Sequence, residues 1–265
     1  MTHSDSPAMQ VPDVYAGVLG AGAGAVHGRE QELARALLAA VPSAALVARH
    51  NRAFVLAAAA ACVRQYGMTQ ILDLGAGRPT GRNVHDVAHE ADPTVSLCYV
   101  DHSHAAVAQL EEQGPTASEG RVSYLVADIG DPRAVLDSTA VRETIDPARP
   151  TAVLLGAVVP YLTEVDVPDM LREYADALAP GSILVLSHGT YDFDRPKVQR
   201  MQEVYEAHGI PSRMRSEDEV RALVEQAGVT VLPPGIVATN QWQPDGVRAG
   251  EAGEACMYGL WGRIG

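Results

Sequence analysis

Apolar residues follow two different periods along this chain. Between residues 29 and 66 they recur at helical spacing, as at Leu33 and Leu37, and the pattern is interrupted at Pro42 before it resumes. This arrangement predicts two helices, one on each side of the proline. Residues 1–28 have no clean period, because glycine and alanine alternate in the stretch "VLGAGAGAVHG", and they predict no regular element.

From residue 69 onwards, short apolar runs alternate with segments of helical period. We expect strands at residues 69–77, 96–103, 122–129, 151–161 and 182–189, helices at 82–91, 104–113, 132–145 and 166–182, and then a helix at 216–228 followed by strands at 229–237 and 255–264. Apolar strands that alternate strictly with helices are typical of an α/β protein, with a parallel sheet covered on both faces. The prediction is one globular unit, with a helical N-terminal extension at residues 1–66 and a doubly wound core at residues 67–265.

The composition narrows the classes of partner and the compartment. The net charge of −13 repels nucleic acid and anionic membrane surfaces, so we expect neither as a partner. No apolar run reaches 18 residues and the N-terminus lacks a signal pattern, which favours a cytoplasmic protein. Cys62, Cys98 and Cys256 are widely spaced and odd in number, so they indicate reduced thiols. Lys197 is the one lysine among many arginines, a bias that suggests a GC-rich genome such as that of an actinomycete.

A glycine-containing loop follows the first predicted strand in "ILDLGAGRPTGRNVHDV". Gly75 and Gly77 form the start of a dinucleotide fingerprint. That fingerprint requires a third glycine three residues later, where this chain has Thr80 preceded by Pro79. The loop therefore lacks the feature that binds a pyrophosphate, and an NAD oxidoreductase is a distant alternative.

Acidic residues stand at the ends of three successive predicted strands. Asp73 can receive an ammonium group, Asp101 can accept hydrogen bonds from both hydroxyls of a ribose, and Asp128 can accept from an exocyclic amine beside the apolar wall of Ile129. Each carboxylate could instead be a helix cap or a turn residue. Together they describe a ligand with an amino group, a ribose and an adenine but no phosphate, which is S-adenosylmethionine (SAM).

The segment "LDLGAGRPTGRNVHDVA" resembles the D-x-G-x-G-x-P-T-x-x-N-V-H loop of an actinobacterial family of S-adenosyl methyltransferases, within class I of the SAM-dependent methyltransferases. "ARHNRAF", "YVDHS", "ADIGDP" and "ALAPGSILVLSH" match that family in the same order, and the resemblance covers about residues 10–265. It implies a Rossmann-like fold with a seven-stranded, mostly parallel sheet whose last strand is antiparallel. The candidate cofactor-binding residues are Asp73, Gly75, Gly77, Thr80, Asn83, Asp101, His102, Asp128, Ile129, Arg52 and Gly156, and the resemblance also places Asn51 near the cofactor.

The resemblance is weakest near the N-terminus, where the family carries a segment like V-Y-D-Y-L-L-G-G-K-D-N that resembles an active-site cover. Here the segment reads "VYAGVLGAGAG", and its acidic, lysine and asparagine positions hold Ala16, Gly22, Ala23 and Gly24. We expect a mobile cover of altered polarity, which closes on ligand at an entropic cost.

Methyl transfer requires a general base only where the acceptor carries a proton. His188, at the end of the fifth predicted strand, is the first candidate because histidine titrates near neutral pH. Tyr161, Tyr191 and Tyr15 are further candidates, although aromatic rings often only wall a pocket. His85 and His89 have metal-ligand spacing but no evident third ligand, so we expect no metal.

The resulting hypothesis is a SAM-dependent methyltransferase that acts on a small molecule in bacterial specialised metabolism. One alternative is a SAM-using enzyme that performs intramolecular cyclisation or aminocarboxypropyl transfer and releases methylthioadenosine. Another is a non-catalytic SAM-binding regulatory protein. A homodimer is the candidate assembly.

Overall fold

The computed structural model describes residues 9–20, 28–115, 119–246 and 250–265. One sheet runs through the molecule in the order β3-β2-β1-β4-β5-β8-β6, and β7 pairs with β8 beside this path. The strands are β1 (Gln70–Leu74), β2 (Ser96–Asp101), β3 (Val122–Val126), β4 (Ala152–Gly156), β5 (Ile183–Gly189), β6 (Val229–Val231), β7 (Val237–Ala238) and β8 (Met257–Ile264).

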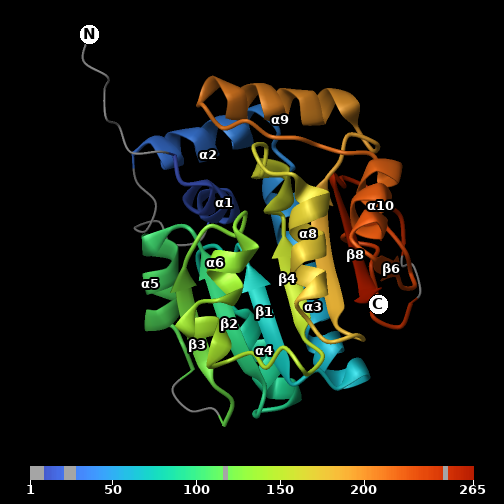
Figure 1. Cartoon of the computed structure of the whole chain (residues 1–265). Helices are drawn as coiled ribbons and strands as arrows, with labels where there is room; N and C mark the ends of the chain where they lie inside the picture. Colours follow the sequence, from blue (N-terminus) through green and yellow to red (C-terminus); the bar gives the residue numbers. More distant parts are fainter. Residues whose placement is uncertain (1–8, 21–27, 116–118, 247–249) are drawn as a thin grey trace.

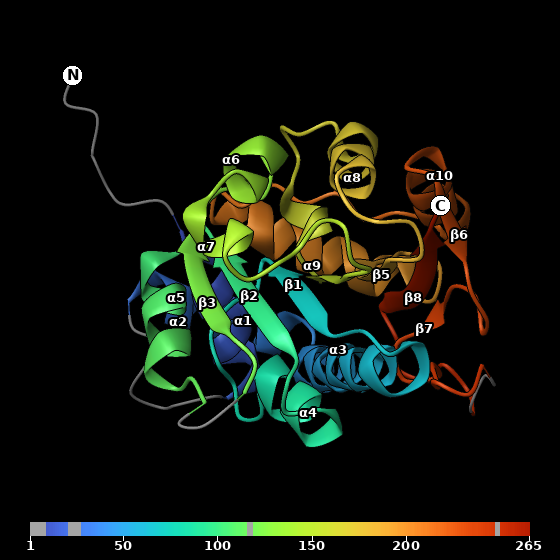
Figure 2. The ribbon, with the colours of Figure 1, turned by 60° about the horizontal axis from the view of Figure 1, so that its bottom comes forward.

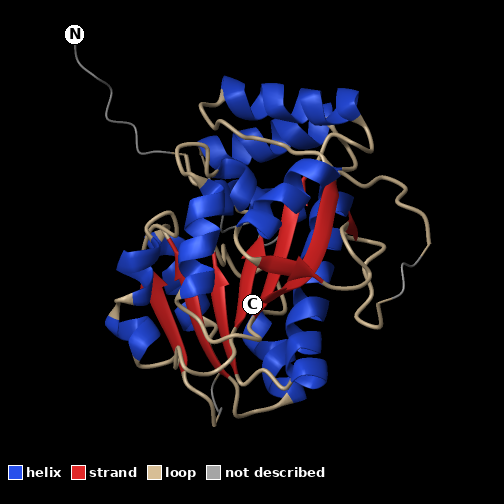
Figure 3. Ribbon diagram, turned by 45° about the vertical axis from the view of Figure 1, so that its right-hand side comes forward, coloured by secondary structure: helices blue, strands red, loops and turns tan. Residues whose placement is uncertain are grey.

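Strands β1 to β5 are parallel, whereas β8 is antiparallel to both of its neighbours, β5 and β6. Figure 3 shows the strands as a layer with helices on both sides. The predicted α/β fold, with a mostly parallel sheet and an antiparallel last strand, is confirmed. The sheet has one strand more than expected, because the two-residue β7 adds to the seven of the main path.

Ten α-helices and one 3-10 helix are assigned within the described residues. They are α1 (Val11–Leu19), α2 (Arg29–Ala40), α3 (Ala44–Tyr66), α4 (Val84–Ala91), α5 (His104–Glu112), α6 (Pro132–Leu136), α7 (Thr139–Arg142), η1 (Val159–Tyr161), α8 (Val167–Asp176), α9 (Arg195–Ala207) and α10 (Glu217–Gln226). In Figure 2, α3 and α4 lie on one side of the sheet, and α6, α8 and α10 on the other.

Alternate residues of β1 enter two separate hydrophobic cores, as the two-residue period of a strand requires. Leu72 and Leu74 pack with α8 and α10, whereas Ile71 packs with α3 and α4. Asp73 therefore faces the side of the sheet that α3 covers. Helix α3 is long and apolar enough to cross a membrane by length and composition alone, but most of that stretch is buried inside the protein.

A third core joins the N-terminal helices to the C-terminal half of the chain. Val14 of α1, Leu33 of α2 and Tyr205 of α9 are buried in one cluster. Figure 1 shows α1, α2 and α9 in the upper part of the view, beyond the carboxyl ends of the parallel strands. These helices are placed to cover whatever binds at that edge of the sheet.

The structure differs from the predicted elements in five places, and one of them is the strand expected at 229–237, which is divided into β6 and β7. Helix α1 forms where no element is expected, and it ends at Gly20 in the left-handed region. Helix α9 is also new, and Asp194 caps it by accepting a hydrogen bond from the backbone of Lys197. The helix expected at 132–145 is divided into α6 and α7 because the side chain of Ser138 caps a new helix. The strand expected to reach residue 161 ends at Gly156, because Ala157 is left-handed with a φ of 59°.

Candidate functional site

A cavity of about 620 Å³ lies at the carboxyl ends of β1, β2 and β4. We call this cavity the main pocket. Ten of the eleven predicted cofactor-binding residues line it, namely Arg52, Asp73, Gly75, Gly77, Thr80, Asp101, His102, Asp128, Ile129 and Gly156. Parallel strands bring their carboxyl ends to one edge of a sheet, so residues that are far apart in the sequence meet here.

The turn after β1 depends on its two glycines. Gly75 and Gly77 have φ values of +74° and +69°, a backbone conformation that is strained for any residue with a Cβ atom. A Cβ atom on Gly75 would also lie 2.6 Å from the side chain of Val158. The backbone N–H of Gly77 donates to Oδ2 of Asp101 over 2.9 Å, so the carboxylate that ends β2 fixes the shape of the β1 turn.

Asp101 keeps acceptor capacity for a ligand. Its Oδ1 accepts a hydrogen bond from the backbone of Ser103 over 2.9 Å, and its Oδ2 accepts the one from Gly77. An ionised carboxylate has about four acceptor positions, so about two stay open at the pocket. That capacity matches the two hydroxyls of a ribose.

Asp73 is a buried carboxyl group at the base of the main pocket. Burial raises its pKa to about 7, Arg52 acts to lower it, and the nearby Asp101 acts to raise it. A carboxylate held in such surroundings gains most from a cationic partner. An ammonium group in the pocket would supply that partner.

Helix α3 presents two polar side chains to the pocket whose hydrogen-bonding capacity is incomplete. Asn51 donates from Nδ2 to the hydroxyl of Tyr15 over 3.0 Å, while its Oδ1 is buried without a partner. Arg52 donates from Nη2 to the carbonyl oxygen of Arg82 over 2.8 Å, while its Nε is buried without a partner. Buried polar atoms in folded proteins are nearly always paired, so these two atoms point to a polar ligand. An amino acid group, with its ammonium and carboxylate, fits beside Asp73.

Asn83 is the predicted cofactor residue that the structure does not place in the lining of the main pocket. It precedes α4 and forms a capping box with Asp86, whose Oδ2 accepts from the backbone of Asn83 over 2.7 Å. Its Oδ1 also lies 3.4 Å from Nη2 of Arg52. Asn83 is therefore a helix cap that supports Arg52, because the chain has already turned into α4 at this position.

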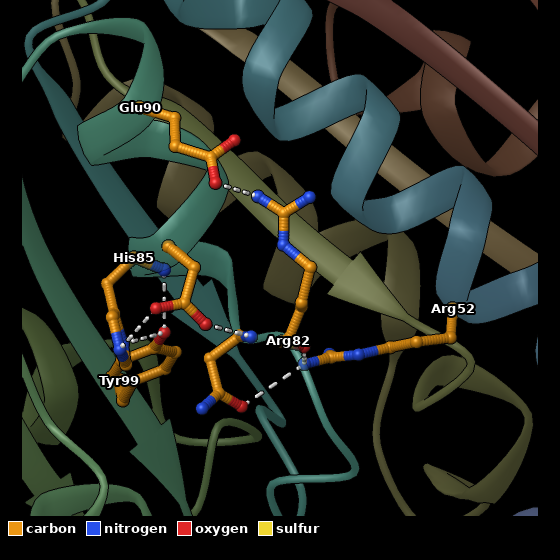
Figure 4. Close-up of polar contacts among 7 residues, drawn as sticks. Arg52, Arg82, His85, Glu90 and Tyr99 are labelled. Carbon is orange, nitrogen blue, oxygen red and sulfur yellow. Dashed lines mark hydrogen bonds and ion pairs between the residues drawn. The ribbon is translucent and has the colours of Figure 1, made fainter.

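The two histidines of α4 have structural roles. His85 contacts the hydroxyl of Tyr99 through its backbone N–H and through Nδ1, at 3.0 and 2.9 Å (Figure 4). Nε2 of His89 lies 3.0 Å from the carbonyl oxygen of Val95. Within the part of the chain that the structure describes, no group of three or more His, Cys, Asp or Glu residues is arranged to hold a metal ion.

Two of the predicted catalytic tyrosines line the main pocket. The hydroxyl of Tyr15 donates to the carbonyl oxygen of Ala48 over 2.9 Å, which ties α1 to α3. Tyr161 packs edge-on against Tyr205, with ring centroids 5.6 Å apart. Burial raises the pKa of both Tyr15 and Tyr161, so these phenols are neutral at physiological pH and wall the pocket.

The structure does not bring His188 or Tyr191 to the main pocket. His188 is fully buried, with Nδ1 2.7 Å from the carbonyl oxygen of Gly189 and Nε2 2.8 Å from Nη1 of Arg215. Because a carbonyl only accepts and a guanidinium only donates, both ring nitrogens are occupied. Burial lowers the pKa of His188 to about 4. Tyr191 instead donates to Glu219 over 2.7 Å, so neither residue is placed to act as a base here.

The segment that follows α9 supplies pocket residues that the sequence patterns do not indicate. His208, Gly209, Ile210 and Pro211 line the pocket. Nδ1 of His208 lies 2.8 Å from the carbonyl oxygen of Val204 and must donate to it, so Nε2 of the neutral ring carries a lone pair. No signal marks this segment in the sequence, since α9 itself was not expected.

Helix α1 covers the pocket and is fastened to the cofactor loop. Val11, Pro12 and Tyr15 line the pocket, and Asp13 forms a largely buried ion pair with Arg78. Ala16 of the altered cover is buried on α1, whereas residues 22–24 lie outside the described residues.

The comparisons with known proteins agree with this geometry. Residues 6–265 match the model of a family described as S-adenosyl methyltransferase. A DUF574 family protein from Streptomyces avermitilis superposes with a TM-score of 0.88 at 30% identity, covering 98% of this chain and 99% of its own. A putative methyltransferase from Thermobifida fusca gives a TM-score of 0.83 at 28% identity, covering 96% and 94%.

A more distant similarity concerns the fold alone. Human N-acetylserotonin methyltransferase, solved in complex with SAM, gives a TM-score of 0.51 at 12% identity and covers 90% of this chain and 57% of its own. The sequence has no match among curated proteins.

Proposed function

Because the chain belongs to the S-adenosyl methyltransferase family, we propose that it transfers a methyl group from SAM to a small molecule in bacterial specialised metabolism. One observation carries the proposal: the strand-end carboxylates Asp73, Asp101 and Asp128 line the same cavity as Asn51 and Arg52. The cavity of about 620 Å³ falls in the range of about 300–1,000 Å³ that is usual for small-molecule sites.

The methionine end of SAM fits the α3 side of the pocket. Asp73 and the unpartnered Oδ1 of Asn51 receive the ammonium group, and Arg52 receives the carboxylate. When bound there, SAM supplies an electrophilic methyl group on its sulfonium sulfur. The chain's part is to bind, to orient and to exclude water, which are the main contributions to a displacement of this kind.

The nucleoside end fits the opposite side. Asp101 accepts from the ribose hydroxyls with the acceptor positions that Gly77 and Ser103 leave open. Asp128 accepts from the adenine amine, and Ile129 packs against the base. The three carboxylates Asp73, Asp101 and Asp128 would repel a pyrophosphate.

His208 is the candidate base where the acceptor loses a proton. It lines the same pocket as the cofactor residues, and its hydrogen bond to Val204 leaves Nε2 able to accept a proton. This assignment replaces His188, whose nitrogens are both engaged away from the pocket.

A thermal-shift comparison of SAM, S-adenosylhomocysteine and NAD tests the cofactor. A ligand at 100 times its dissociation constant stabilises the folded state by about 2.7 kcal/mol, or about 5–10 °C for a chain of this size. We expect SAM and S-adenosylhomocysteine to give shifts of this order and NAD to give none. Stabilisation by NAD alone would overturn the proposal, and release of methylthioadenosine from SAM without an acceptor would favour the cyclisation or aminocarboxypropyl alternative.

Turnover tests the role of His208. With an acceptor found by release of S-adenosylhomocysteine from a metabolite extract, we expect His208→Gln to lower kcat by about 10²–10⁴-fold, the usual contribution of a positioned base. The affinity for SAM should not change. The exposed His104 on α5 provides the matched control, His104→Gln, and equal effects of the two variants would exclude His208 as the base.

A further inference from the structure

A second, smaller cavity adjoins the main pocket, and we call it the annex. It has a volume of about 70 Å³, several times the roughly 10–15 Å³ that one water molecule needs. Tyr15, Ala157 and Tyr161 line both cavities. The two cavities therefore meet at these three residues.

The annex is built from apolar side chains. Its other lining residues include Val47 on α3, Val198 and Met201 on α9, and the methionines Met214 and Met257. Among the described residues that line it, none is Asp, Glu, Lys, Arg or His. Burial raises the pKa of Tyr161, Tyr205 and Cys256, so these groups stay neutral near pH 7. A charged group would find no counter-ion here, and burying it would cost several kcal/mol.

Ala157 is the smallest of the three residues that line both cavities. This residue follows the last residue of β4 and has a φ of 59°, a conformation that costs roughly 1–3 kcal/mol outside glycine. Its backbone N–H donates to Oγ of Ser187 over 2.9 Å, which holds it in place. Ala157 follows Gly156 of the main pocket directly, so the chain presents only a methyl group at this point of the shared lining.

We propose that the annex binds a small apolar substituent of the methyl acceptor, so that the acceptor is a molecule with an uncharged, apolar end of a few carbon atoms. The inference rests on the proposed function, because it assigns the substrate class of the same site. The three methionines suit this role, since thioether side chains adapt to groups of different shape. The reacting end of the acceptor then lies on the cofactor side of Tyr15 and Tyr161.

Calorimetric titration of alkylphenols into the S-adenosylhomocysteine complex tests the annex without turnover. Phenol, 4-methylphenol and 4-ethylphenol serve as probes, and 4-hydroxyphenylacetate serves as the charged counterpart. We expect affinity to rise about fourfold for each added carbon up to ethyl, the effect of burying one methylene. The charged compound should bind at least tenfold more weakly than 4-ethylphenol. Affinities that do not depend on the alkyl group, or no binding of any phenol, would overturn the proposal.

Two variants change the annex in opposite directions. Ala48→Leu fills the annex from α3, so the affinity should no longer rise with the length of the alkyl group. Met201→Ala widens the annex, so the affinity should continue to rise up to 4-butylphenol. Ala57→Leu is the matched control, because Ala57 lies on the exposed side of the same helix. If Ala48→Leu does not fold, Met201→Ala decides alone. Failure of the wild-type protein to bind S-adenosylhomocysteine would contradict the proposed function, whereas unchanged alkyl dependence in both variants would contradict only the annex.

Discussion

Asp73 makes the stability of the free protein depend on pH. Its pKa is about 7 in the folded chain against an ordinary value of 3.8, so the folded state holds this proton more tightly than the unfolded state. Stability is therefore lost as the pH rises from about 4 to about 7, at up to about 1.4 kcal/mol per pH unit.

We expect Asp73→Asn to flatten this part of the pH profile. The apparent Tm of the variant without ligand should fall less between pH 5 and pH 8 than that of the wild type, as differential scanning fluorimetry would measure. SAM affinity should be lower in the variant, because a neutral amide cannot neutralise an ammonium group. Asp137→Asn, which alters an exposed ion pair with Arg142, is the control. An unchanged Tm profile together with full SAM affinity would contradict both the raised pKa and the contact.

His188 makes the stability of the folded protein depend on pH in the opposite direction. Its pKa is lowered to about 4 from 6.5, so the unfolded state takes up a proton that the folded state resists, and stability is lost as the pH falls from 6.5 to 4. We expect His188→Gln to be less sensitive to acid, since the amide oxygen can still accept from Arg215. Turnover at pH 7.5 should stay within about twofold. A large loss of turnover with an unchanged Tm would return His188 to the list of catalytic groups.

Site residues could be predicted from the sequence when the strand order alone determines their position in the fold. Asp73, Asp101 and Asp128 end parallel strands, so topology brings them together whatever packs around them. His188 also ends a strand, but its partner Arg215 lies 27 residues later in the chain. No local pattern in the sequence reveals that contact, and for this reason the base was misplaced.

Among the elements, α1 packs in the third core, and two polar contacts join it to the site. The ion pair between Asp13 and Arg78 joins it to the cofactor loop, and the hydrogen bond from Tyr15 to Ala48 joins it to α3. Asp13 does not line the pocket itself, so a change there acts on the position of the helix. The cover and the cofactor loop are therefore mechanically coupled.

We expect Asp13→Asn to weaken SAM binding by about tenfold, which corresponds to about 1.4 kcal/mol. The reason is that Arg78 loses its carboxylate in a largely buried setting. Glu90→Gln provides the control, because Glu90 pairs with Arg82 of the same loop where both side chains are more than half exposed. Titration calorimetry measures the SAM affinity of each variant. Equal affinities for the two variants would show that α1 docks independently of the loop.

Elements were predictable where cap residues and periods agree, as in α10 with its capping box of Ser216 and Glu219. Helices α1 and α9 could not be predicted in this way. Their apolar faces pack in the third core, which is formed mainly by helices, and not against the sheet. Val14 and Tyr205 gain their burial only from tertiary contacts. Propensity and pattern carry little information about such helices.

At the scale of the whole molecule, the sequence establishes half of the site. The cofactor half follows from the order of strands in the sheet. The proposed acceptor half is lined by residues of α1, α2, α3 and the segment after α9, and α1, α2 and α9 lie beyond the carboxyl ends of the strands (Figure 1). Evolution can alter this second half without disturbing the first, so relatives that share the SAM loop can differ in acceptor.

The position of β8 between β5 and β6 has a consequence for biosynthesis. Residues 257–264 are made after both neighbours, so after Val231 the ribosome must add 33 more residues, up to Ile264, before the sheet can close. At about 5–20 residues per second this takes roughly 2–7 s. Throughout that interval the edge of β5 is unpaired and β6 has no partner, and nascent chains on neighbouring ribosomes can pair with that edge. Slower translation of the last segment would lengthen this exposure and lower the yield of soluble protein.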